Sequence, residues 1–236
     1  MSFNIYGGIV LFSISILIFM LYNIYGKYLK GKDILLSLGV FFLALMAPGL
    51  LITSFNQLLP AVLLSLYFML EFVVTTDLGD IKDVEVETRL KSKTPPVVFG
   101  VRVKDNKITY PIRFKAYVYS LRILMVAVLA IFIIQQNIGI ESIGIVFIVL
   151  FVIISIGSLA IITKLFGDNV FDRRKLLVRI GINELMTFNA VPLVVLAVLD
   201  VEAVSRLVIL AIIVLAPMIW LKLFLRVSYK DIVPIT

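Results

Sequence analysis

The chain has 236 residues, of which 61% are hydrophobic and only 16% are charged, and its formal net charge is +7. Soluble domains are roughly 45–50% apolar and about 25% charged, so this composition indicates a protein that folds in a lipid bilayer. The chain has no cysteine and no histidine. This excludes disulfides, thiolate nucleophiles, histidine-based triads and Cys/His zinc sites, and it leaves carboxylates as the main candidates for chemistry.

Seven segments approach the ~20 apolar residues that a membrane-spanning helix needs. They are Ile5–Tyr25, Ile34–Thr53, Leu58–Thr75, Ala116–Ile134, Ile143–Phe166, Leu176–Leu199 and Leu207–Leu225. The short link 54–57 predicts that the second and third form an antiparallel helical hairpin. We expect an all-α polytopic membrane protein with six or seven transmembrane helices and a small cytoplasmic β-hairpin insert. Its single membrane domain would hold helices 1–3 in residues 1–75, a cytoplasmic segment in 76–115 and helices 4–7 in 116–236.

Basic residues gather in alternate loops. They follow the first, third, fifth and seventh predicted spans, whereas the other loops hold one basic residue, Arg206. Because cytoplasmic loops are enriched in Lys and Arg, this pattern predicts a multi-pass protein of the cell membrane with its N terminus outside and its C terminus in the cytoplasm. The same rule explains the net positive charge of the chain. We therefore expect the lipid bilayer, and no nucleic acid, as the partner of the basic residues.

The cytoplasmic segment 76–115 contains a predicted β-hairpin. Val97–Val103 and Ile108–Phe114 alternate in character and flank Asp105 and Asn106, a favourable two-residue turn. Prolines before the first stretch and inside the second favour edge or terminal strands. We therefore expect a small hairpin at the membrane surface.

Two stretches at the predicted cytoplasmic ends of spans 1 and 3 stand out. Thr75–Asp83 places three carboxylates and a glycine where the third span ends. Alone, it is typical of a helix terminus with solvated charges, although acidic residues at a helix C terminus oppose the macrodipole. Leu21–Leu29, taken alone, is typical of an aromatic interfacial belt followed by basic anchors.

Together the two stretches resemble motifs of the type IV prepilin peptidase family, whose archaeal members process preflagellins and pilins. Asp77-Leu78-Gly79-Asp80-Ile81-Lys82 is similar to the family's Gly-x-Gly-Asp motif, with Asp in place of the first glycine. Asn23-Ile24-Tyr25-Gly26-Lys27-Tyr28-Leu29 is similar to the motif of the first catalytic aspartate, with Asn at the leading position. The resemblance covers roughly residues 1–90.

The resemblance implies an aspartic peptidase that removes the N-terminal leader of prepilins or preflagellins at the cytoplasmic membrane face, without a metal or organic cofactor. It implies that Asp80 and position 23 are catalytic, and the residues that support the motifs are Asp77, Gly79, Lys82 and Lys27. Such enzymes need two carboxylates that share a proton. Because Asn23 cannot ionise, three interpretations are open: an engineered inactive variant, a naturally inactive homologue, or a pair formed by Asp77 and Asp80.

Substrates of this family carry basic residues before the cleavage site and a hydrophobic helix after it. Acidic side chains are expected to attract the basic leader, and the candidates are Asp77, Asp83, Glu85, Glu87 and, within the third span, Glu71. Pairing of the first four with nearby Lys82, Arg89 and Lys91 is the alternative. For the other polar residues within predicted spans we expect structural roles, and these are Arg122, Arg179, Asn183 and Glu184.

Two other function classes are open from the sequence. A membrane transporter or channel fits seven spans with intramembrane charges, although the chain lacks an evident inverted repeat. A non-catalytic assembly platform of a surface appendage would use the cytoplasmic hairpin for docking. Phospholipid-type transferases also place acidic motifs near a cytoplasmic face, but their denser Asp-Gly-Ala-Arg pattern is absent from the chain.

Overall fold

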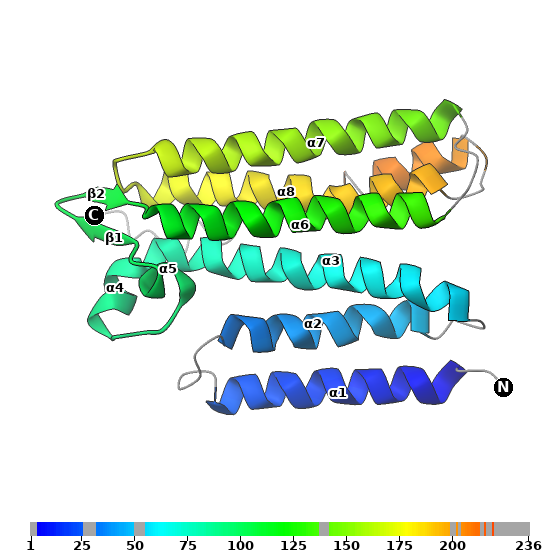
Figure 1. Ribbon diagram of the computed structural model, residues 1–236, viewed down its shortest axis with the longest axis horizontal. Coiled ribbons are helices and arrows are strands. Elements are labelled where there is room, and N and C mark those ends of the chain that lie inside the picture. Colours follow the sequence, from blue (N-terminus) through cyan, green and yellow to red (C-terminus); the bar gives the residue numbers. More distant parts are fainter. Residues whose placement is uncertain are drawn as a thin grey trace.

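The computed structural model describes residues 4–25, 32–49, 55–136 and 142–198, together with 202, 204–212, 215 and 219. Six long helices run alongside one another (Figure 1). Their bounds are α1 (Asn4–Tyr25), α2 (Lys32–Gly49), α3 (Phe55–Asp80), α6 (Ile112–Gln135), α7 (Ser142–Gly167) and α8 (Arg173–Val198).

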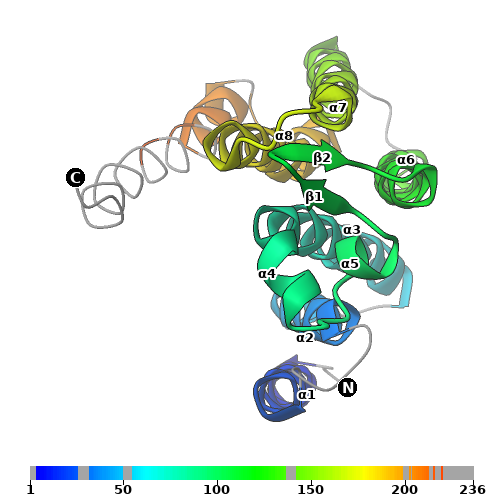
Figure 2. The same cartoon turned by 90° about the vertical axis from the view of Figure 1, so that its left-hand side faces the viewer.

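The six helices form a bundle with a row of helices attached to one side. α3 packs on α6 and α8, and α7 packs on α8, so the main core lies among these four. Val74, Phe114, Leu129 and Val194 are fully buried there. α2 packs on α3, and α1 packs on α2. Figure 2 shows α3, α2 and α1 following one another outward from the bundle, which places α2 between α1 and α3.

Within the described ranges, five helices are long and apolar enough to cross a membrane, by length and composition. They are Tyr6–Tyr25, Leu58–Arg89, Ile112–Gln135, Gly144–Gly167 and Arg173–Val198. Large apolar side chains on their outer faces, such as Leu17, Ile123 and Ile153, are more than half exposed. Exposed apolar side chains of this kind are stable in hydrocarbon. The described residues are mostly helical, and their long apolar helices are consistent with a multi-pass membrane protein.

The number of spans agrees with the sequence prediction only in part. The second predicted span corresponds to α2, which is 18 residues long and is not among the five. The seventh predicted span, Leu207–Leu225, lies largely outside the described residues.

One end of the bundle carries the short elements. They are the 3-10 turn η1 (Ile81–Asp83), the helices α4 (Val84–Arg89) and α5 (Pro95–Val98), and the antiparallel strands β1 (Arg102–Lys104) and β2 (Lys107–Thr109). Asp105 and Asn106 join the strands with φ of 50° and 59°, as a two-residue hairpin turn with both residues at positive φ requires. Backbone hydrogen bonds between the hairpin and residues 169–171 fasten it to the α7–α8 connection.

The hairpin is confirmed, but it is shorter than predicted. Pro95–Val98 forms a helical turn because proline is pre-organised for the first position of a helix. Residues 112–114 begin α6 directly after Pro111. α3 also runs beyond its predicted end at Thr75, so the acidic motif is helical and continues without a break into η1 and α4.

Candidate active site at the ends of α2 and α3

The acidic motif occupies the last turn of α3. Asp77 and Asp80 are three positions apart, so their side chains lie on the same side of the helix. Asp77 is fully buried, and Asp80 is half-buried. Gly79 is helical, and a Cβ added there would contact nothing within 4 Å. The motif is therefore helical at this point, and Asp77 fits in place of the family's first glycine as an ordinary helical residue.

A third carboxylate comes from the first turn of α2. α2 and α3 are antiparallel neighbours, so the beginning of α2 lies beside the end of α3 (Figure 1). Asp33 is only 3% exposed there and interacts electrostatically with both Asp77 and Asp80. Asp33 does not stand out in the sequence, because a charged residue before an apolar block is typical of a span boundary. The feature of the sequence that could have identified Asp33 is its position at the start of α2, which a short α2–α3 hairpin places opposite the end of α3.

Glu87 of α4 completes a group that we call the acid cluster: Asp33, Asp77, Asp80 and Glu87. Glu87 repels Asp80 electrostatically, and its Oε2 accepts a hydrogen bond from the buried Thr94 hydroxyl at 2.5 Å. Lys32 interacts favourably with the cluster carboxylates, which places a cation beside them. Four acidic groups therefore converge where α2, α3 and α4 meet.

The cluster carboxylates are only partly satisfied by the protein. The Tyr117 hydroxyl of α6 donates a hydrogen bond to Asp77 Oδ2 at 2.8 Å. Among the described residues, Asp33 Oδ2, Asp77 Oδ1 and Asp80 Oδ2 are buried without a hydrogen-bond partner. A buried acceptor without a partner costs about 1–3 kcal/mol. Three such oxygens in one place are a mark of a functional site rather than of a stabilising network.

Burial sets the electrostatics of this site. Burial raises the pKa of the Asp33 carboxyl, and the positive charge of Lys32 offsets part of that rise. Neighbouring carboxylates also disfavour one another's charged form, so a group like this titrates as a unit and keeps a proton that isolated carboxylates would lose. The cluster can therefore hold a protonated and an ionised carboxyl at the same time.

The structure does not bring Asn23 into this site. Asn23 is exposed near the end of α1, and α2 separates α1 from the acidic end of α3 (Figure 2). Lys27, the other residue expected from the first motif, lies outside the described residues. Asp80 is instead close to Asp77, as one of the open interpretations had it, and to Asp33.

The remaining predicted site residues are spread over two places. At the polar end, Lys82 and Asp83 form an ion pair at 3.9 Å, Asp83 also pairs with Arg173 of α8 at 3.0 Å, and Glu85 is exposed. Glu71 lies deep in the bundle, where Arg122 donates to its Oε2 at 2.5 Å. This location separates Glu71 from the acid cluster.

The described residues contain no group of three or more Asp, Glu, His or Cys side chains arranged to hold a metal ion. Carboxyl groups that lie this close to one another can exchange protons, and this is the chemistry that the acid cluster itself offers. Comparisons of the chain with protein-family models, with curated proteins and with solved structures found no match.

Proposed function

We propose that the chain is a membrane aspartic endopeptidase of the prepilin peptidase type, with Asp33 and Asp80 as its reacting carboxyl groups. The observation that carries the proposal is the acid cluster, in which these two residues interact electrostatically and each has a buried oxygen without a partner among the described residues. Under this proposal Asn23 is a surface residue of α1, and the chain has both carboxyl groups that the reaction needs.

The two carboxyl groups take different roles because closely spaced carboxyls share a proton. One of the two holds that proton and donates a hydrogen bond to the scissile carbonyl. The other is ionised and acts as the base that takes a proton from water. The water oxygen attacks the carbonyl carbon, the peptide C–N bond breaks, and the departing nitrogen receives the proton that the base took from water.

Two neighbouring groups support this pair. Tyr117 holds Asp77 through its hydrogen bond, and Asp77 interacts electrostatically with both Asp33 and Asp80, so it belongs to the same group of coupled carboxyls. Exposed acidic side chains at the same end, such as Glu85, favour the approach of a basic leader. The substrate class that fits is a prepilin or preflagellin whose hydrophobic helix lies in the bilayer while its basic leader reaches the acid cluster.

The proposal is tested by cleavage of a prepilin-type peptide, with a basic leader and a hydrophobic helix, by the full chain in liposomes. We expect the unmodified chain to cleave the peptide, and Asp33→Asn and Asp80→Asn each to lower the rate by at least about 100-fold, as removal of an acid–base group does. Asp83→Asn is the matched control. It removes an acidic group at the same end of the bundle, and we expect a change of less than about threefold because Asp83 forms a partly exposed ion pair.

Two further measurements separate this proposal from its competitors. Addition of EDTA should leave cleavage unchanged, because the mechanism uses no metal, whereas loss of activity would indicate metal-dependent chemistry at the acidic residues. Asn23→Asp should have little effect. If the unmodified chain is inactive and Asn23→Asp creates activity, position 23 is the missing partner and the assignment of Asp33 is wrong.

A further inference from the structure

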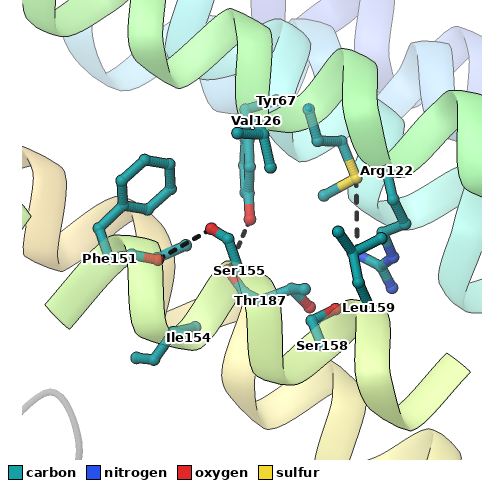
Figure 3. Close-up of a pocket in the computed structure, with 11 residues that line it drawn as sticks. Tyr67, Arg122, Val126, Phe151, Ile154, Ser155, Ser158, Leu159 and Thr187 are labelled. Atoms are coloured by element: carbon teal, nitrogen blue, oxygen red, sulfur yellow. Dashed lines mark hydrogen bonds between the residues drawn. The ribbon is translucent and has the colours of Figure 1, made fainter. Parts of the chain in front are cut away.

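A second polar site lies inside the bundle, well away from the acid cluster. A cavity of about 20 Å³ lies between α3, α6, α7 and α8. Arg122, 3% exposed, lines it together with Tyr67 of α3. Figure 3 shows the Arg122 guanidinium directed toward the side of the cavity where Ser158 and Thr187 lie.

The guanidinium of Arg122 is only half satisfied by protein groups. Its Nη1 donates to Glu71 Oε2 at 2.5 Å and contacts Met125 Sδ at 3.5 Å. Its Nε and Nη2 are buried and have no partner among the described residues. Because a guanidinium carries five N–H donors and no acceptor, the site calls for a ligand that accepts hydrogen bonds.

The cavity walls supply further polar groups for such a ligand. Ser155 donates its hydroxyl hydrogen to the Phe151 carbonyl, and Ser158 donates to Asn183 Oδ1. Each hydroxyl oxygen therefore still has lone pairs that accept hydrogen bonds. The same molecule can accept from Arg122 and donate to a serine oxygen, which is the behaviour of water.

Charge and size decide between water and an anion. Glu71 already balances the charge of Arg122, and Thr187 donates to its other oxygen at 2.5 Å. An added anion would leave an uncompensated negative charge in an apolar interior, which is very costly. A cavity needs about 10–15 Å³ to hold one water molecule, so 20 Å³ is sufficient.

We propose that this cavity is a built water site, in which a water molecule accepts hydrogen bonds from Arg122 Nε or Nη2 and donates to the serine hydroxyls of α7. The water links α6 to α7 at the level of the Glu71–Arg122 pair. It thereby adds a link between α6 and α7 to the Ser158–Asn183 hydrogen bond, which joins α7 to α8.

The first test reduces the cavity. Ala190 of α8 lines it and is 3% exposed, so Ala190→Val adds two methyl groups at the expense of the water. We expect the apparent melting temperature of the detergent-solubilised chain to fall by roughly 2–6 °C, because the displaced water leaves guanidinium N–H groups unsatisfied. An unchanged or higher melting temperature would overturn the proposal, because filling a dry cavity stabilises a protein.

The second test excludes simple overpacking. In the double variant Glu71→Met/Arg122→Met the guanidinium is gone, so Ala190→Val should no longer lower the melting temperature. An equal fall in both backgrounds would show a steric effect and would count against the water site. An experimental structure at high resolution should show ordered density in the cavity that does not change when chloride is replaced by bromide. Bromide in that place would contradict the proposal.

Discussion

The acid cluster and the Glu71–Arg122 pair bury charge on the same helix in opposite ways. Given the rise of 1.5 Å per residue, Glu71 lies roughly 9 Å from Asp77 and roughly 13 Å from Asp80 along α3. Both oxygens of Glu71 are satisfied, by Arg122 and by the hydroxyls of Thr187 and Thr75. In the acid cluster, like charges face one another, and three carboxylate oxygens have no partner among the described residues.

This difference separates a structural polar contact from a reactive one. A paired charge has low free energy in one protonation state only, so it holds helices in register and is poorly suited to proton transfer. A crowded group of carboxyls has protonation states that lie close in free energy, so it can both give and accept a proton. Intramembrane charge alone therefore does not mark a catalytic site in this fold.

Breaking the ion pair should produce the largest loss of stability. Glu71→Ala leaves Arg122 as an uncompensated buried charge, and we expect the free energy of unfolding to fall by about 3–5 kcal/mol. The double variant Glu71→Met/Arg122→Met should be close to the unmodified chain or more stable, because apolar residues replace both charges. Denaturant unfolding in micelles measures both. A loss for Glu71→Ala of less than about 1 kcal/mol would show that the charge of Arg122 does not depend on Glu71 for compensation.

A bulky residue at the α1–α2 contact should have an intermediate effect and should sharpen the assignment of the site. A Cβ at Gly39 would lie 2.5 Å from Phe19 Cε1, so Gly39→Leu forces α1 away from α2. We expect a loss of about 1–3 kcal/mol, typical of overpacking. Gly181→Leu is the control, because a Cβ there meets nothing within 4 Å. If the reacting pair is Asp33 and Asp80, cleavage should survive in Gly39→Leu, whereas its loss would indicate that α1 contributes to the site.

The fold was largely predictable from the sequence because its signals are local. Apolar blocks gave the long helices, and Asp105 and Asn106 gave the hairpin turn, which needs residues that accept positive φ. The C-terminal end of α3 was not predictable in the same way. Helical structure continues past Asp80 into α4, so the acidic residues are not at the last free carbonyls and the expected conflict with the macrodipole does not arise.

The candidate site was predictable in part. Asp77 and Asp80 stood out as a motif, but their partner depends on which helices are neighbours. A motif in α1 and a motif in α3 share one end of the bundle, and nothing in their sequence shows that α2 lies between them. Asp33 comes close to Asp80 only through the antiparallel packing of α2 and α3, which is a tertiary property.

Replacing Asp33 should have the smallest effect on stability, with the opposite sign. The pKa of Asp33 is raised in the folded chain from its ordinary value of 3.8. Between the ordinary and the raised pKa, the folded chain binds more protons than the unfolded chain. The free energy of unfolding therefore falls as pH rises through that range. Asp33→Asn removes this cost, so we expect a gain of about 0.5–2 kcal/mol at neutral pH that disappears on acidification toward pH 3.8. Thermal unfolding across that pH range measures it, with Asp83→Asn as the control that should stay within about 0.5 kcal/mol at every pH.

A variant that is more stable and no longer cleaves would identify Asp33 as a residue retained for chemistry at the expense of the fold. If Asp33→Asn is instead destabilised at neutral pH, the Asp33 carboxylate anchors the start of α2, and the contrast between the acid cluster and the Glu71–Arg122 pair is smaller than the structure indicates.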